Sequence, residues 1–223
     1  MSSAPADYDA LWDGAWKEAS ARGPGFTSRY ATLLRLMGEH GAAGRFLEIG
    51  AGRGGFLDDV ASRFPWLERS AHDGSARARE ALRARDDLAA VYAGDLGAGL
   101  DLGSSWDVLV CSEVLEHVRD HDAALDALVR HLRPGGRLYL SVPLRPDLWT
   151  QVDDAVGHVR RYQQGELAAM CAARGLTVLA DRSTGFPLYN AYYRRLGRRS
   201  PAETAADAPR GLIARFAARA LGR

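Results

Sequence analysis

From residue 45 onward, short apolar runs alternate with stretches of helical periodicity. The apolar runs, which we expect to be strands, are residues 45–50, 70–73, 88–92, 106–112, 137–142 and 176–180. The stretches with helical periodicity are residues 55–64, 76–85, 123–132 and 166–174. Strands that alternate with helices of this length form βαβ units with right-handed crossovers. The sequence therefore predicts an α/β, doubly wound fold, in which a mostly parallel sheet carries helices on both faces.

The composition is that of a globular domain. Its 223 residues suffice for one core, and 29 basic against 28 acidic residues leave a formal charge of +1, which argues against a nucleic-acid partner. Cys111 and Cys171 lie too far apart for a metal or redox motif. No apolar run approaches the roughly 20 residues of a spanning helix. The first ten residues lack the regions of a signal peptide, so we expect a cytoplasmic protein.

Two flanking regions complete the predicted organisation. Residues 1–43 are expected to form a helical cap with helices at 7–20 and 27–40, which either closes over a site as a lid or packs on a sheet edge. The α/β core is expected to span residues 44–182. Residues 183–223 are expected to form a helical extension with no convincing seventh strand, ending in a basic amphipathic helix at 211–223. This helix is expected to dock on the body of the protein or on a second subunit of a homodimer, or to contact a membrane surface or an acidic macromolecule.

Three acidic residues lie at the ends of three consecutive predicted strands, where doubly wound sheets bind their ligands. Glu48 directly precedes a glycine-rich turn, GAGRGG at residues 50–55, whose backbone can approach a ligand closely. Asp73 ends the second strand and Asp95 follows the third. Because these strand ends share one edge of the sheet, the sequence predicts one acidic ligand site there.

The charge of Glu48 separates two classes of ligand. The glycine spacing also fits nicotinamide and flavin binders, but this carboxylate would repel a pyrophosphate at the turn. It would attract a ligand that carries an amino group and a sulfonium, as S-adenosylmethionine does. Asp73 would then accept hydrogen bonds from the ribose hydroxyls, and Asp95 would reach the adenine amine. A nicotinamide-dependent oxidoreductase remains as an alternative.

These residues resemble the class I S-adenosylmethionine-dependent methyltransferases, in the grouping that contains the ubiquinone-biosynthesis O-methyltransferases. The matching motifs are LEIGAG at 47–52, HD at 72–73, GDL at 94–96, WDVLVCSEVLEHV at 106–118 and LRPGGRL at 132–138. The resemblance implies a Rossmann-like fold that binds S-adenosylmethionine and transfers its methyl group, but it does not name the acceptor. We expect a small-molecule acceptor, with a hydroxyl oxygen as the target. The alternatives are N- or C-methylation and a non-catalytic cofactor-binding partner subunit. The cofactor contacts that we expect are Glu48, Gly50, Ala51, Gly52, Asp73, Gly74, Asp95, Leu96 and Ser112.

A second polar group follows the fourth predicted strand. Glu113, Glu116 and His117 are spaced so that a helical turn would place them on one face. His117 would act as a general base, or the three residues would bind a divalent metal such as Mg, Mn or Zn that lowers the pKa of an acceptor hydroxyl. The resemblance extends to a further histidine that completes such a metal site, and His158 is the candidate. A purely structural loop is the third interpretation.

The segment GHVRRY at residues 157–162 lies beyond the fifth predicted strand, where loops cover the acceptor site. It resembles a segment common in these methyltransferases. His158 is expected to take part in catalysis, and Arg160, Arg161 and Tyr162 are expected to contact the substrate. The alternative is that the arginines hold this loop on the sheet through ion pairs.

Overall fold

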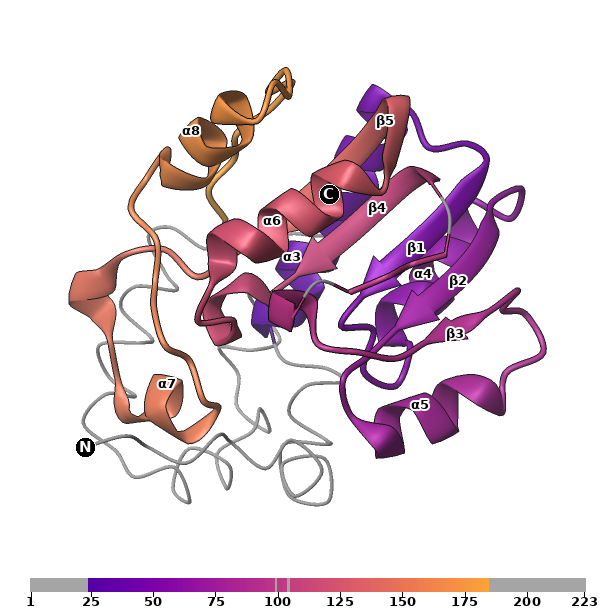
Figure 1. Cartoon of the computed structure of the whole chain (residues 1–223), viewed down its shortest axis with the longest axis horizontal. Coiled ribbons are helices and arrows are strands. Elements are labelled where there is room, and N and C mark those ends of the chain that lie inside the picture. The colour runs from indigo at the N-terminus through magenta and orange to yellow at the C-terminus, as the bar shows by residue number, and fades with distance from the viewer. Residues whose placement is uncertain (1–23, 99, 104, 185–223) are drawn as a thin grey trace.

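The computed structural model describes residues 24–98, 100–103 and 105–184 (Figure 1). Its centre is a parallel sheet with the strand order β3-β2-β1-β4-β5. The strands are β1 (Arg45–Ile49), β2 (Glu68–His72), β3 (Val91–Tyr92), β4 (Trp106–Ser112) and β5 (Leu132–Ser141). The order reverses between β1 and β4, which confirms the predicted doubly wound, Rossmann-like fold.

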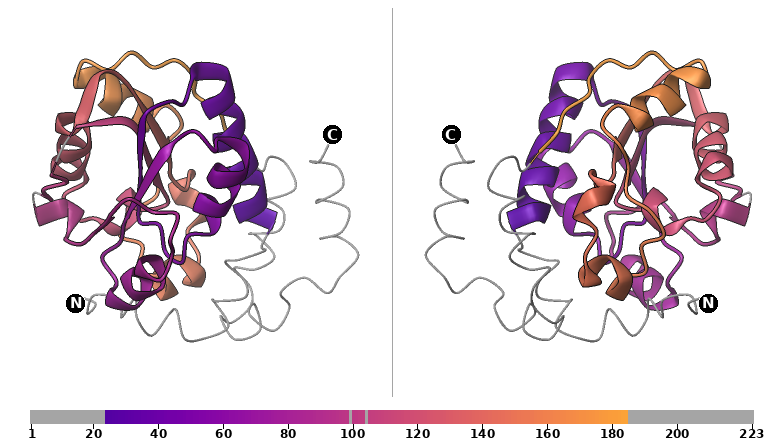
Figure 2. Two further views of the ribbon diagram at one scale, coloured as in Figure 1. Left: turned by 90° about the vertical axis from the view of Figure 1, so that its right-hand side faces the viewer. Right: turned by 90° about the vertical axis from the view of Figure 1, so that its left-hand side faces the viewer.

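Helices cover both faces of the sheet (Figure 2). Their bounds are α3 (Pro24–His40), α4 (Gly55–Arg63), α5 (Ala76–Arg83), α6 (His121–Arg130), α7 (Gln151–Ala155) and α8 (Glu166–Ala173), with short 3-10 turns η1 (Leu96–Ala98), η2 (Leu115–His117) and η3 (Pro146–Leu148). The helices α3, α4 and α5 pack on one face and α6 and α8 on the other. Among the described residues, no helix combines the length and the hydropathy that crossing a membrane requires.

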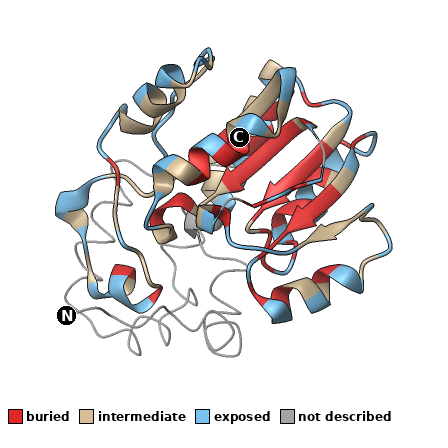
Figure 3. Ribbon diagram, in the orientation of Figure 1, coloured by how far each residue is buried: buried red, intermediate tan, exposed pale blue. Residues whose placement is uncertain are grey.

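The alternation of side chains along the strands builds two cores. Phe46, Val108 and Val110 point to the face of α3 and α4, whereas Leu47 and Leu109 point to the face of α6. All five are at most 1% exposed (Figure 3). A central sheet that is buried on both sides explains why these strands appear in the sequence as nearly continuous apolar runs.

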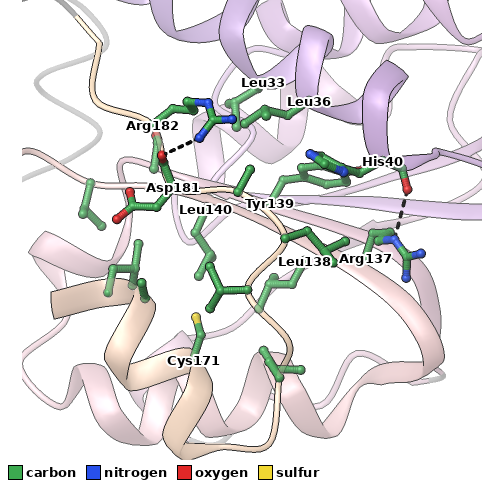
Figure 4. A pocket seen from close by; sticks show the side chains of 18 of the residues that line it. Leu33, Leu36, His40, Arg137, Leu138, Tyr139, Leu140, Cys171, Asp181 and Arg182 are labelled. Carbon is green, nitrogen blue, oxygen red and sulfur yellow. Dashed lines mark hydrogen bonds between the residues drawn. The ribbon is translucent and has the colours of Figure 1, made fainter. Parts of the chain in front are cut away.

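The predicted sixth strand at residues 176–180 is wrong. These residues follow α8 in an irregular path, and a groove of about 940 Å³ lies along the side of β5 that they would have to pair with. Leu138 and Leu140 line this groove from β5, and Leu33 lines it from α3 (Figure 4). In the described part of the chain no strand is bonded to the outer edge of β5, and residues 176–180 line the groove beside it without joining the sheet.

Several predictions on the flanks fall outside the described residues. These are the helix at 7–20, the basic helix at 211–223 and nearly all of the extension at 183–223. The domain boundaries, the homodimer and the membrane contact therefore remain predictions. The predicted helix at 27–40 is confirmed as α3, which begins slightly earlier and packs on the sheet.

Candidate active site

The glycine turn after β1 has the backbone that its sequence predicts. Gly50, Gly52 and Gly54 all have positive φ angles, of 71°, 56° and 84°. Residues that carry a side chain rarely adopt this backbone conformation, and a Cβ atom at position 50 would also collide with Val114. The turn is held by the carbonyl of His72, which accepts hydrogen bonds from the amides of Gly50 and Ala51 at 2.9 and 3.0 Å. The glycines therefore allow the backbone of this turn to pass close to the segment that follows β4.

Glu48 is a buried carboxyl group with an unsatisfied oxygen. Its residue is 3% exposed, and Oε2 has no hydrogen-bond partner among the described residues. Burial raises the pKa of Glu48 well above its ordinary value, and the charge of Asp73 acts in the same direction. A buried polar atom of this kind costs free energy unless a partner satisfies it. A bound group that donates a hydrogen bond or carries positive charge would supply that partner.

Asp73 ties the end of β2 to the glycine turn. Its Oδ2 accepts a hydrogen bond from the Gly52 amide at 2.8 Å, and its Oδ1 accepts one from the Ser75 amide at 2.8 Å. Each carboxylate oxygen can accept a further hydrogen bond. Gly74 follows in an exposed position, where its carbonyl accepts a hydrogen bond from Arg79 at 2.6 Å. The carboxylate of Asp73 is therefore oriented before any ligand arrives.

The remaining expected cofactor residues continue along the same edge of the sheet. Asp95 is exposed after β3, and its Oδ1 accepts a hydrogen bond from the Gly97 amide at 2.8 Å. Leu96 is buried beside it. Ser112 ends β4, where its hydroxyl lies 2.8 Å from that of Ser141. The topology thus brings together the strand ends that the sequence predicts, at the point where the strand order reverses.

Glu113 departs from the predicted arrangement. Its φ angle is 56°, so the chain is not helical there and η2 begins only at Leu115. The Glu113 carboxylate pairs with Arg29 of α3 at 3.0 Å and accepts a hydrogen bond from Ser141 at 3.1 Å. The prediction that Glu113 shares one helical face with Glu116 and His117 is therefore wrong. The role of Arg29 was missed because nothing in the local sequence links residues 29 and 113.

Glu116, His117 and His158 form a compact cluster at the carboxyl end of β4. Each offers one ligand atom, and these atoms lie within 4.8 Å of one another. Glu116 is fully buried, and neither carboxylate oxygen has a hydrogen-bond partner among the described residues. Oε1 of Glu116 lies 3.8 Å from Nε2 of His158, and the two imidazole rings are 4.7 Å apart. Of the four predicted metal candidates, the structure brings these three together.

Burial sets the protonation of this cluster. It raises the pKa of Glu116 well above its ordinary value, and the charge of Glu113 adds to the effect. Burial and the neighbouring His158 lower the pKa of His117 to about 4. At neutral pH the His117 ring is therefore uncharged, and a cation near Glu116 would restore its carboxylate.

Backbone contacts bring His158 to the cluster from forty residues further along the chain. The amide of Val159 donates a hydrogen bond to the Glu116 carbonyl at 2.8 Å. The Gly157 carbonyl accepts a hydrogen bond from Nδ1 of His117 at 3.3 Å. The loop between β5 and α8 is thus attached to η2 by its main chain, on both sides of His158.

Residues 26–181 match the family model for the methyltransferase domain. The chain belongs to this methyltransferase family. A ubiquinone biosynthesis O-methyltransferase from Xanthomonas oryzae is 31% identical over 143 residues, which cover 58% of this chain and 53% of that protein. A mitochondrial ubiquinone biosynthesis O-methyltransferase from Schizosaccharomyces pombe is 35% identical over 103 residues, which cover 44% of this chain and 37% of that one. The chain thus spans about half the length of the curated relatives it matches, or less.

Solved structures support the fold. The N-methyltransferase NodS from Bradyrhizobium japonicum, in complex with S-adenosyl-L-homocysteine, superposes with a TM-score of 0.62 at 22% identity and covers 82% of this chain and 93% of its own. The YcgJ protein from Bacillus subtilis gives a TM-score of 0.59 at 19% identity, with 83% and 87% covered. The predicted class I methyltransferase family is confirmed.

The side chains of residues 160–162 make their contacts within the protein. Arg160 donates a hydrogen bond to the Arg119 carbonyl at 2.6 Å, and Arg161 forms a two-point ion pair with Asp153. Tyr162 is fully buried, with its hydroxyl 2.9 Å from Nδ1 of His121. The structure favours the alternative in which the arginines hold the loop, and the substrate contact of Tyr162 stays a prediction.

Proposed function

We propose that the chain is an S-adenosylmethionine-dependent methyltransferase that methylates a hydroxyl oxygen of a small-molecule acceptor. The observation that carries this proposal is the buried carboxyl of Glu48 before the glycine turn, whose Oε2 lacks a hydrogen-bond partner in the part of the chain that the structure describes. A cofactor with an ammonium group and a sulfonium satisfies that oxygen. A dinucleotide would instead place a pyrophosphate near it, which offers no positive charge to stabilise the ionised carboxylate of Glu48.

The strand ends offer a separate contact for each part of the cofactor. Glu48 would face the methionine end, Asp73 the ribose hydroxyls and Asp95 the adenine amine. The backbone of residues 50–52 would leave room for the cofactor, and Leu96 would pack on its adenine side. Gly74 and Ser112 complete the proposed contacts. The bound cofactor supplies an electrophilic methyl group, so the protein mainly has to align the acceptor and take up a proton.

The proton acceptor is one of the two histidines in the cluster. A general base works best when its pKa lies near the working pH, and the lowered pKa of His117 makes this ring a weak base. We therefore propose His158 as the principal base, with His117 holding the acceptor hydroxyl. Nε2 of His158 would accept the proton of that hydroxyl as the methyl group leaves the sulfonium sulfur for the oxygen, with the neutral thioether as the leaving group.

Transfer of a radiolabelled methyl group tests this function. The purified protein is incubated with methyl-labelled S-adenosylmethionine and a panel of small phenols, aliphatic alcohols and amines. We expect label on a hydroxyl compound, and at least 100-fold less label with the His158→Gln variant. Label on amines alone would favour N-methylation. Cofactor binding without transfer to any acceptor would favour the non-catalytic partner subunit.

A specific observation favours a metal-assisted variant of this function. Within the described residues, the two oxygens of Glu116 are buried without hydrogen-bond partners beside two imidazoles. A donor set of one oxygen and two nitrogens suits Zn or Mn better than Mg. Glu116, His117 and His158 would hold the ion, which would lower the pKa of an acceptor hydroxyl. Calorimetry with zinc chloride tests this variant. Stoichiometric binding that is lost in Glu116→Gln would support it, and full turnover in excess chelator would contradict it.

A further inference from the structure

Asp153 is a buried acid of the loop that carries His158. It lies in α7 and is 1% exposed. Arg161 donates to its two oxygens at 2.7 and 2.8 Å, and the amide and hydroxyl of Thr150 donate to Oδ2 at 2.8 and 3.1 Å. These four donor contacts, two of them from a guanidinium, stabilise the charged form of the carboxylate. The buried carboxylate is therefore ionised and accepts hydrogen bonds only.

The contact between Asp153 and His158 determines which ring nitrogen of His158 carries the hydrogen. Nδ1 of His158 lies 2.8 Å from Oδ1 of Asp153, and the His158 amide donates to the Asp153 carbonyl at 2.9 Å. Because the carboxylate cannot donate, the hydrogen of a neutral His158 ring lies on Nδ1. The lone pair then lies on Nε2, the atom that is 3.8 Å from Glu116. In the sequence only the short spacing relates residues 153 and 158, and that spacing does not predict the hydrogen bond between their side chains.

We propose that Asp153 is the positioning residue that fixes the orientation and the tautomer of His158 at the acceptor site. This inference rests on the proposed role of His158 at that site, and it deepens it. A base and a metal ligand both need the lone pair on Nε2, so Asp153 would serve either version of the proposed function. The nearest competing explanation is that Asp153 is only structural, since it also caps α7 and pairs with Arg161.

The tautomer of His158 distinguishes the two explanations. We would label the histidine rings with nitrogen-15 and record their long-range correlation spectrum at pH 8, assigning the signals with a His158→Gln variant. In the intact chain we expect His158 to carry its hydrogen on Nδ1. In Asp153→Asn we expect a mixture or the opposite tautomer, because an amide can present either a donor or an acceptor to the ring. If the His158 ring of the unaltered protein carries its hydrogen on Nε2, this result alone overturns the proposal, before any variant is measured.

Arg161→Lys is the matched control. It disturbs the same buried ion pair while it keeps the charge and leaves the bond between Asp153 and His158 in place. Both variants should lower the melting temperature, but only Asp153→Asn should change the tautomer. Retention of the Nδ1 hydrogen in Asp153→Asn, or its loss in both variants, would show that Asp153 is only structural.

Kinetics then connect the tautomer to turnover. With an acceptor identified by label transfer, we expect Asp153→Asn to lower kcat by about 100-fold or more at nearly unchanged KM for S-adenosylmethionine. An unchanged kcat alongside a changed tautomer would overturn the proposal. If the unaltered protein methylates no acceptor, the proposed function fails, whereas the tautomer measurement still decides the role of Asp153.

Discussion

The two halves of the ligand-binding edge are built in different ways. At the ends of β1, β2 and β3, the cofactor half consists of a glycine turn and acids that each belong to a strand end. At the ends of β4 and β5, the acceptor half joins η2 to a loop forty residues away. Both halves contain a buried carboxyl with an unpartnered oxygen among the described residues, Glu48 in one and Glu116 in the other. The first half follows from the topology of the sheet, whereas the second depends on how one loop folds.

This difference explains why the fold is shared more widely than the chemistry. A turn and three strand ends recur wherever the same sheet is built, so they indicate the cofactor class. The acceptor half is carried by a segment that can change without disturbing the sheet, so we expect it to determine the substrate. The predictions below test whether the two halves are as separable as this comparison requires.

The largest effect is expected from Arg161→Ala in the acceptor half. The side chains of Arg161 and Asp153 are 7% and 1% exposed, and removal of one partner leaves a buried, uncompensated charge. We expect the free energy of unfolding to fall by about 3–5 kcal/mol. Denaturant titration measures this loss. Affinity for S-adenosylmethionine should stay within about twofold under native conditions, and a large loss of affinity would mean that the halves are coupled.

Asp73→Ala should produce the next largest effect, now in the cofactor half. It removes the proposed ribose contacts and leaves the buried amides of Gly52 and Ser75 without their acceptor. We expect calorimetry to show at least a 100-fold loss of cofactor affinity, since hydrogen bonds to charged groups contribute about 1.5–3 kcal/mol each. Glu80→Ala, on the exposed surface of α5, is the control. Equal affinities in the two variants would refute the role of Asp73.

Glu48 should make cofactor binding depend on pH. Its raised pKa keeps it protonated in the free protein, and a cationic ligand favours the carboxylate, so binding should release a proton. Affinity should therefore rise with pH, by up to about tenfold per pH unit, until Glu48 ionises in the free protein. Stability of the cofactor-free protein should show the opposite slope, because the unfolded chain loses this proton at lower pH. Glu48→Gln should abolish both slopes, and slopes that persist in this variant would exclude Glu48 as their source.

The smallest effect is expected from Asp95→Ala. Asp95 is exposed, unlike Glu48 and Asp73, so water competes for its contact with the adenine amine. Competition with water reduces the contribution of an exposed hydrogen bond to about 0.5–1.5 kcal/mol, which predicts a loss of cofactor affinity of about tenfold or less. Calorimetry against the unaltered protein measures it. A loss of affinity as large as that of Asp73→Ala would contradict the expectation that the exposed Asp95 contributes less than the two buried acids.

The sequence predicted the cofactor half well because its features are local. The positive φ angles at Gly50 and Gly52 and the positions of Glu48 and Asp73 all follow from residues that are adjacent in the chain. The roles of these residues as ligands remain predictions. The prediction of a sixth strand failed because β-propensity depends on tertiary context: residues 176–180 line a groove beside the outer edge of β5 and do not pair with it, and periodicity cannot show this.

The acceptor half was harder because its contacts are non-local. Helical spacing grouped Glu113 with Glu116, but the left-handed backbone at Glu113 and its pair with Arg29 separate them. Nothing in the local sequence distinguishes Asp153 from other loop acids. Only the folded structure brings its carboxylate to His158. Only the resemblance to a family pointed from residue 117 to residue 158.

Calorimetric titration of the unaltered protein with S-adenosylmethionine, and separately with a nicotinamide dinucleotide, tests the central claim most directly. That claim is that the acidic edge of the sheet binds an adenosyl ligand with a cationic end. The account predicts stoichiometric binding of S-adenosylmethionine with release of a proton, and no binding of the dinucleotide. Binding of the dinucleotide without any binding of S-adenosylmethionine would contradict it.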